Sequence, residues 1–527
     1  MGFKIIQGIE DATHVARQEL FRLGTALLFI IAIMLFSSNI RAAGAPVSIE
    51  LVVAAMIGGY MAINIGANDV ANNVGPAVGS RALTLVGAII IAAIFEASGA
   101  LIAGGDVVGT IKKGIIDPAL IANGDEFIWL MMAALLAGAL WLNVATYVGA
   151  PVSTTHAIVG GVLGAGVAAG GWSIANWSTM GAIAASWVIS PLIGGIIAAV
   201  FLYLIKHTIT YKKDMLSAAN RMVPLLVALM AWAFSTYLVL KGLKQLVKLD
   251  LYSALGIGLA IAILTYIIVR PLVRKFARTM PNEKSTINAM FTVPLIFAAA
   301  LLSFAHGAND VANAVGPLAA INDAVTSHAV ASKVAIPIWV MMVGAAGIAL
   351  GLALYGPKLI RTVGSEITDL DQMRAFCIAM AAALTVIIAS QLGLPVSSTH
   401  IAVGGVFGVG FLREYIKANY SKVIQDIEHH HQGADQTEVE QFMEQFHRAP
   451  LEEKRLMLIQ LKQHKARAEL TKKERKGLRK VYSQELVKRS ALLKIAAAWL
   501  ITVPVSGFLA AMLFFTIRGM MLPRVLP

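Results

Sequence analysis

Two short segments of nearly identical sequence place acidic and amide side chains inside apolar runs. Residues 66–76 read GANDVANNVGP and residues 307–317 read GANDVANAVGP, with ten identities in eleven positions. An unpaired carboxylate among apolar residues is costly enough to indicate function, although a carboxylate that caps a helix N-terminus is the simpler alternative. The duplication favours function, and these groups suit a hard cation such as Na⁺ or hydrogen bonds to an anion. The motifs predict ion binding by Asp69, Asp310, Asn72 and Asn313, anion binding by Asn68 and Asn309, and a further amide at Asn73.

A second duplicated motif supplies hydroxyl groups. Residues 151–156 read PVSTTH and residues 395–400 read PVSSTH. Proline in the first turn and serine or threonine at the cap are typical of a helix N-terminus, where backbone N–H groups attract anions. The alternative is a pair of proline-kinked helices whose hydroxyls satisfy their own backbones. The motifs predict anion binding by Ser153, Thr154, Thr155, Ser397, Ser398 and Thr399, and leave the roles of His156 and His400 open between substrate binding, proton transfer and helix orientation.

Neither motif contains lysine or arginine. A multiply charged anion bound there must therefore be compensated by a mobile cation, Na⁺ or H⁺, held by Asp69 and Asp310. That requirement describes cation-coupled anion transport. Glu96 in the segment FEASGA is a third carboxylate in an apolar run, and it suits an ion site and a structural partner of a neighbouring helix equally well.

The spacing of the motifs indicates that whole halves of the chain are duplicated. Asp69 precedes His156 by 87 residues, and Asp310 precedes His400 by 90 residues. Paired interrupted segments in two halves are typical of secondary transporters, whose site lies at the repeat interface near the middle of the bilayer.

The composition supports a membrane protein. Of 527 residues, 57% are hydrophobic and 14% are charged, and about thirteen apolar segments recur along the chain, so a disordered chain and a soluble multidomain enzyme are excluded. The net charge of +13 lies between apolar segments and indicates membrane topology, not nucleic-acid binding. No nucleophile elbow supports a membrane hydrolase, and a receptor or scaffold would leave the duplication unexplained.

We expect an all-α polytopic membrane protein with about 12 to 13 transmembrane segments, an inverted internal repeat, and re-entrant or broken helices. Basic loops around residues 206–221 and 270–284 should be cytoplasmic. The expected parts are an N-terminal extra helix, retained and not cleaved (1–49), a first transport repeat (50–205), linking helices with basic cytoplasmic loops (206–286), a second transport repeat (287–411), a polar cytoplasmic insertion (412–493) and a last transmembrane helix (494–527).

At these motifs the sequence resembles the inorganic phosphate transporter (PiT) family, over most of residues 50–411 and the last apolar segment. The resemblance implies symport of inorganic phosphate with Na⁺, or with H⁺ in some bacterial members, by a multi-pass protein of the plasma or bacterial inner membrane that is often a homodimer. It implies Na⁺ at Asp69 and Asp310, phosphate at the six hydroxyls, and neither catalytic residues nor a cofactor. A sulfate permease of the same family is the alternative.

Overall fold

The computed structural model describes residues 2–40, 48–121, 123–150, 152–242, 249–327, 336–366, 370–430 and 489–521. Within these ranges the chain is almost entirely helical, and β structure is limited to one isolated bridge between Ile116 and Ala175. The α-helices are α1 (Gly2–Ser37), α2 (Ile49–Asn68), α3 (Val70–Gly79), α4 (Leu85–Ala103), α5 (Gly105–Lys113), α6 (Gly124–Val148), α7 (Thr154–Gly170), α8 (Trp177–Ile205), α9 (Met215–Lys241), α10 (Leu251–Ala277), α11 (Lys284–Met290), α12 (Thr292–Asp310), α13 (Ala312–Ser327), α14 (Ile338–Glu366), α15 (Gln372–Gln391), α16 (Ser398–His430) and α20 (Arg489–Met521).

Eleven of the described segments are long and apolar enough to cross a membrane. The outer helices expose large apolar side chains, as α10 does with Leu259, Leu264 and Ile267, because lipid tails solvate them as well as a protein core does. The chain is therefore a multi-pass membrane protein, and the predicted all-α class is confirmed. The estimate of 12 to 13 crossings was higher because it counted the short apolar helix α7 and the start of α16 separately.

Each acidic motif interrupts a helix at its aspartate or at the residue that follows it. In the first half, α2 ends at Asn68 and α3 begins at Val70, so Asp69 lies between the two helices. In the second half, α12 ends at Asp310 and α13 begins at Ala312. Asp69 and Val311 keep right-handed helical angles, so each break is a local interruption between two buried helical segments and not a loop.

Each hydroxyl motif starts a new helix after a glycine turn. Gly149 follows α6 with φ +74°, and Gly393 follows α15 with φ +67°. Both angles lie in the left-handed region that glycine adopts without steric cost, which lets the chain reverse and enter the next helix. Ser153 is the N-cap of α7, and α16 begins at Ser398, so each motif does provide a helix N-terminus.

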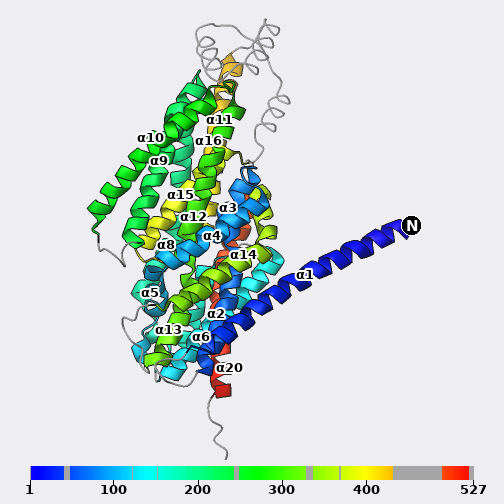
Figure 1. Cartoon of the computed structure of the whole chain (residues 1–527), viewed down its shortest axis with the longest axis vertical. Coiled ribbons are helices and arrows are strands. Elements are labelled where there is room, and N and C mark those ends of the chain that lie inside the picture. Colours follow the sequence, from blue (N-terminus) through cyan, green and yellow to red (C-terminus); the bar gives the residue numbers. More distant parts are fainter. Residues whose placement is uncertain are drawn as a thin grey trace, which may run out of the picture.

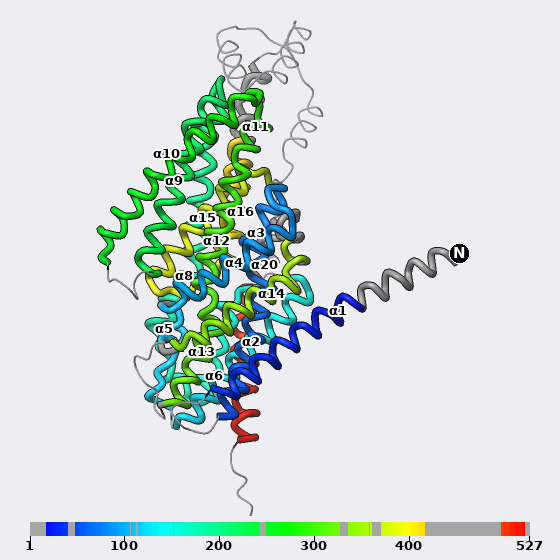
Figure 2. The backbone as a smooth tube through the Cα atoms, in the orientation of Figure 1, coloured from blue at the N-terminus to red at the C-terminus, as the bar shows by residue number. Residues whose placement is uncertain are grey.

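The two halves interlace and do not simply lie beside one another. Helix α14 of the second half packs along α2 of the first, and α4 of the first packs along α12 of the second. In the same way α20 packs along α7, and α8 packs along α16. Figures 1 and 2 show the resulting bundle, with α9 and α10 side by side on one flank and α1 slanting away from the rest.

Glycines at the helix crossings define which positions of the two halves are equivalent. Gly66 of α2 lies against the carbonyl oxygen of Ile348 in α14, and Gly307 of α12 lies against the carbonyl oxygen of Glu96 in α4. A Cβ atom at either glycine would collide with the neighbouring backbone, so only glycine permits this approach. The internal repeat therefore relates α2 and α3 to α12 and α13, α4 to α14, α7 to α16, and α8 to α20.

The basic loops gather at one end of the bundle. Asn282, between α10 and α11, donates to the carbonyl oxygen of Lys213 at 2.9 Å and accepts from the backbone N–H of Leu216 at 3.0 Å, which joins the two basic loops. Helices α11 and α16 reach the same end in Figure 1. Helix α16 continues past the expected boundary at residue 411 to His430, whereas residues 431–488 of the predicted insertion lie outside the described residues.

Candidate functional site

The first serine of each hydroxyl motif caps its own helix. Ser153 accepts a hydrogen bond at its Oγ from the backbone N–H of His156 at 3.1 Å, and Ser397 accepts one from the N–H of His400 at 3.2 Å. These bonds fix the two helix N-termini and orient the hydroxyls that follow. The serines are thus structural parts of the site, whatever they also bind.

The second hydroxyl of each motif binds the aspartate of its own repeat. Thr154 donates a hydrogen bond to Asp69, and Ser398 donates one to Asp310 at 3.1 Å. The start of α7 is thereby tied to the break between α2 and α3, and the start of α16 to the break between α12 and α13. The sequence placed these residues more than eighty positions apart, and the fold brings each pair into direct contact.

The third hydroxyl of each motif crosses to the other repeat. Thr399 donates to Asp69 at 3.1 Å and accepts from the amide of Asn72 at 2.9 Å. In the mirrored arrangement, Thr155 accepts from the amide of Asn313 at 3.2 Å. The site is therefore shared by the two halves, as expected for the interface of a transporter repeat.

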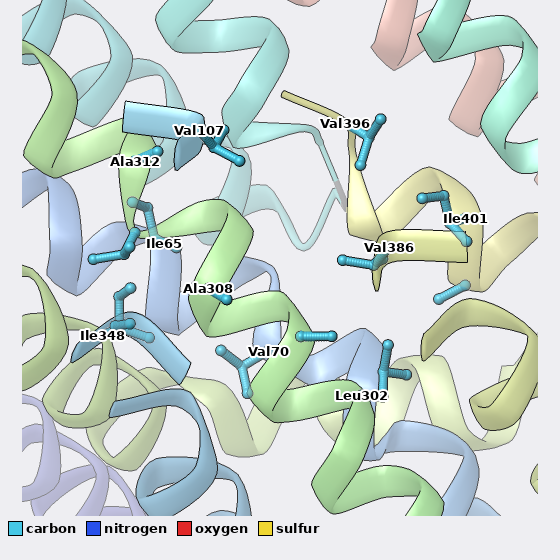
Figure 3. Close-up of a cluster of buried hydrophobic side chains, with 14 of the residues drawn as sticks. Ile65, Val70, Val107, Leu302, Ala308, Ala312, Ile348, Val386, Val396 and Ile401 are labelled. Carbon is cyan, nitrogen blue, oxygen red and sulfur yellow. The ribbon is translucent and has the colours of Figure 1, made fainter. Parts of the chain in front are cut away.

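The two aspartates meet at this interface. One side-chain ligand atom from each of Asp69, His306 and Asp310 can be chosen so that the three lie within 4.8 Å of one another. Each of these side chains is at most 1% exposed. Val70 and Ala312, which lie beside the helix breaks, belong to the buried hydrophobic cluster shown in Figure 3. Two carboxylates this close in a low-dielectric environment repel each other strongly unless a cation or proton offsets them.

The asparagines that precede the aspartates hold them in place. Asn68 contacts the hydroxyl of Thr146 at 3.1 Å, and Asn309 contacts that of Ser390 at 3.0 Å. When each amide oxygen accepts from its hydroxyl, each amide N–H reaches the adjacent aspartate, at 3.3 Å for Asp69 and 3.1 Å for Asp310. Thr146 and Ser390 lie just before the glycine turns, and no sequence signal distinguished them from other polar residues in apolar helices.

Glu96 contacts an asparagine and a histidine of the site and not the motif hydroxyls. Its Oε1 accepts from the amide of Asn73 at 2.8 Å, and its Oε2 lies 2.6 Å from Nδ1 of His306. His306, whose Nε2 lies 2.9 Å from Asp310 Oδ2, was missed by sequence reasoning. Its place directly before the second acidic motif was the available signal. It also brings a basic side chain to a site whose motifs contain no lysine or arginine.

The histidines of the hydroxyl motifs stack with aromatic rings behind the helix N-termini. His156 packs on Trp187 with ring centroids 3.8 Å apart, and His400 packs on Trp499 at 3.5 Å. The two histidine rings lie 4.4 Å apart, edge to face. Within the described part of the chain neither ring is hydrogen-bonded to an aspartate, which favours the helix-orienting role for both.

The assembled groups can bind a hard cation and an oxyanion together. Carboxylate oxygens and the amide oxygens of Asn72 and Asn313, which have no hydrogen-bond partner among the described residues, are suitable ligands for Na⁺. Hydroxyl groups and the N–H groups at the starts of α7 and α16 are suitable donors to a tetrahedral anion. The predicted residues from both halves thus form one cluster.

Comparison with known proteins adds independent evidence. The model of the phosphate transporter family matches residues 65–510. A Helicobacter pylori (strain J99) protein named "Putative phosphate permease" is 54% identical over 524 residues, covering 98% of each chain. A Pyrococcus furiosus protein of the same description is 40% identical over 378 residues, which is 72% of this chain and 90% of that one.

A solved structure described as "The sodium-dependent phosphate transporter" is similar to the whole fold. It matches with a TM-score of 0.74 and 32% identity, covering 90% of this chain and 100% of that one. The match agrees with the helical architecture and with a transporter, not an enzyme. The site geometry, the family model and the relatives together show that this chain belongs to the phosphate transporter family.

Proposed function

We propose that this phosphate transporter is a symporter that couples inorganic phosphate to Na⁺. The observation that carries the proposal is the meeting of Asp69 and Asp310, one from each repeat, among hydroxyls from both helix N-termini. Two buried carboxylates cannot accept an anion beside them unless cations enter as well. Similarity to a solved sodium-dependent phosphate transporter supports Na⁺ as that cation.

The residues take two kinds of role in this proposal. Cations bind at Asp69 and Asp310, with Asn72 and Asn313 as further ligands. Phosphate accepts hydrogen bonds from the hydroxyls of the two motifs, and the N-terminal backbone of α7 and α16 adds favourable partial charge. Asn68 and Asn309 act through the aspartates that they contact.

Competition for the hydroxyl protons couples the two substrates. A hydroxyl has one proton to donate, and in this structure Thr154 and Ser398 donate theirs to the aspartates. Cations bound at the carboxylates take over the neutralisation of these oxygens, so the hydroxyls become free to turn toward phosphate. Cation binding therefore precedes or accompanies phosphate binding, and the empty carrier does not hold phosphate alone.

Burial of the site explains why a conformational change must follow. The two aspartates and the hydroxyls of Thr154, Ser398 and Thr399 are each about 1% exposed. Access from either side of the membrane therefore requires movement of interlaced helices from the two halves, which is the alternating-access behaviour of repeat transporters.

Phosphate rather than sulfate is favoured by the acceptor groups of the site. Near neutral pH phosphate still carries protons that it can donate, whereas sulfate only accepts. The amide oxygens of Asn72 and Asn313 are buried without a hydrogen-bond partner among the described residues, and they can accept such a proton or bind a cation. A sulfate permease remains the alternative, and it would leave these acceptors to the cation alone.

Uptake into proteoliposomes tests the proposal directly. Radiolabelled phosphate should enter when a Na⁺ gradient is imposed at constant pH, and excess unlabelled sulfate should compete weakly. Uptake driven only by a pH gradient would overturn Na⁺ coupling, and stronger competition by sulfate than by phosphate would overturn the substrate. Crosslinking in the same liposomes would test the homodimer, which stays a prediction.

A further inference from the structure

Three departures from the internal repeat lie in contact with one another. The only mismatch between the two acidic motifs is Asn73, which corresponds to Ala314. The residue before the second motif is His306, and the one before the first motif is Ile65. The third departure is Glu96, which the glycine crossings relate to Ile348.

Where α4 of the first half crosses α12 of the second, the three polar residues form a continuous chain. Asn73 donates to Glu96 at 2.8 Å, Glu96 contacts Nδ1 of His306 at 2.6 Å, and Nε2 of His306 lies 2.9 Å from Asp310. All four side chains are at most 1% exposed. The chain begins in α3, passes through α4 and ends at the helix break after α12, so it links the acidic motif of one repeat to the aspartate of the other.

At the repeat-related crossing of α14 with α2, the equivalent positions are apolar and buried. Ile65 and Ile348 are fully buried and Ala314 is 1% exposed. Figure 3 labels Ile65 and Ile348 in the buried apolar cluster. The same helix crossing is thus built once with polar and once with apolar side chains, which shows that the fold itself does not require the polar chain.

The environments of the two aspartates differ as a result. Both oxygens of Asp69 accept only hydroxyl donors outside its own motif, Thr154 and Thr399, which can rotate and can themselves bind a cation. Oδ2 of Asp310 accepts a hydrogen bond from Ser398 and lies 2.9 Å from Nε2 of His306, an ion-pair contact without hydrogen-bond geometry; Glu96 contacts the other nitrogen of that ring. A buried imidazole hydrogen-bonded to Glu96 through Nδ1 turns less freely than a hydroxyl, so Nε2 stays beside Asp310.

We propose that Asn73, Glu96 and His306 form one positioning chain that holds Asp310 and makes the two aspartates non-equivalent, so that Asp69 is the principal cation ligand. The inference rests on the proposed Na⁺-coupled function and deepens it. It gives Glu96 a positioning role in place of direct ion binding. Without the chain, Asp310 loses the imidazole beside Oδ2 and keeps only a rotatable hydroxyl there, as Asp69 does, so it becomes a second carboxylate open to a cation that must be filled before the anion binds.

The internal repeat supplies a variant that should remove the chain and keep the fold. Asn73→Ala/Glu96→Ile/His306→Ile installs the three residues that the repeat-related helix crossing already uses at the equivalent positions. Replacing a whole group of buried polar side chains by apolar ones is often tolerated. Removing only one of them leaves its partners buried without a hydrogen bond, which is destabilising. Glu96→Ile or His306→Ile alone should therefore lower thermal stability in detergent more than the triple variant does.

The test compares Na⁺ activation with phosphate affinity in proteoliposomes. For the triple variant, the Na⁺ concentration for half-maximal uptake should rise about tenfold or more with a steeper activation curve. The phosphate concentration for half-maximal uptake at saturating Na⁺ should stay within about threefold of the native value, because every hydroxyl is retained. The control Ile65→Val/Ile348→Val, at the equivalent apolar positions, should leave both quantities unchanged.

Other results would overturn the inference. An unchanged Na⁺ activation curve in the folded triple variant would exclude a specific role of the chain toward Asp310. Equal shifts in the Na⁺ and phosphate concentrations for half-maximal uptake would exclude it as well. If the triple variant does not fold, Asn73→Ala decides by the same two measurements, with a smaller Na⁺ shift expected. Native protein that transports phosphate without Na⁺ stimulation would refute the proposed function itself, an outcome visible before any variant is made.

Discussion

Replacing Ser398 by alanine tests whether the motif hydroxyls bind phosphate. The hydroxyl of Ser398 donates to Asp310 at 3.1 Å, and the side chain is 1% exposed. The substitution removes one oxygen atom and leaves Asp310 in contact with His306 at 2.9 Å, so the carboxylate is not stranded. The expected effect is therefore the loss of one hydrogen bond from the protein to a charged ligand.

Such a bond contributes about 1.5 to 3 kcal/mol, which corresponds to roughly a tenfold to hundredfold change in affinity. The phosphate concentration for half-maximal uptake at saturating Na⁺ should rise by that factor in Ser398→Ala. The measurement is initial-rate uptake of radiolabelled phosphate into proteoliposomes containing equal amounts of folded protein.

Ser303→Ala is the matched control for this substitution. Ser303 also lies in the buried part of the bundle, on α12, but its hydroxyl has no hydrogen-bond partner among the described residues. In Ser303→Ala the phosphate concentration for half-maximal uptake should stay within about threefold of the native value. An unchanged phosphate concentration for half-maximal uptake in Ser398→Ala would show that the hydroxyls do not form the phosphate site. An equal rise in Ser303→Ala would show the same.

Four further predictions concern the aspartates, a helix crossing and, twice, the polar insertion. Asp69→Asn should abolish Na⁺-driven phosphate uptake without loss of folded protein, because the charge of the principal cation ligand is removed, whereas Asp310→Asn should lower uptake less, because His306 already contacts that carboxylate; near-native uptake by Asp69→Asn would contradict its role. Gly307→Ala should strongly reduce thermal stability in detergent, since its Cβ would collide with the backbone of α4, and an unchanged melting temperature would contradict the crossing. Ser483→Cys in a Cys377→Ala background should react with an impermeant thiol reagent only after permeabilisation, because the predicted polar insertion is basic, and labelling from outside would reverse the topology. A short flexible linker in place of the insertion should leave reconstituted uptake intact, because neither motif lies within it.

The sequence alone determined the membrane class, the duplication and most of the chemistry of the site. These features are local: apolar length specifies a crossing, proline and serine mark a helix start, and a carboxylate in an apolar run marks function. Asp69, Thr154 and their repeats could be named because each motif carries its own signature. The single mismatch at Asn73 was also visible in the sequence, although its partner was not.

Only the tertiary structure decided which groups meet. Nothing in the order of residues predicts that Thr399 crosses to Asp69, or that Glu96 of one half reaches His306 of the other. These contacts depend on helices that interlace through backbone approaches at glycines such as Gly307, where packing between distant segments fixes the geometry. A local pattern specifies each helix and its polar face, whereas the choice of neighbour is made by the shape of the whole bundle, because lipid and protein interior are equally apolar and hydrophobicity cannot select a partner.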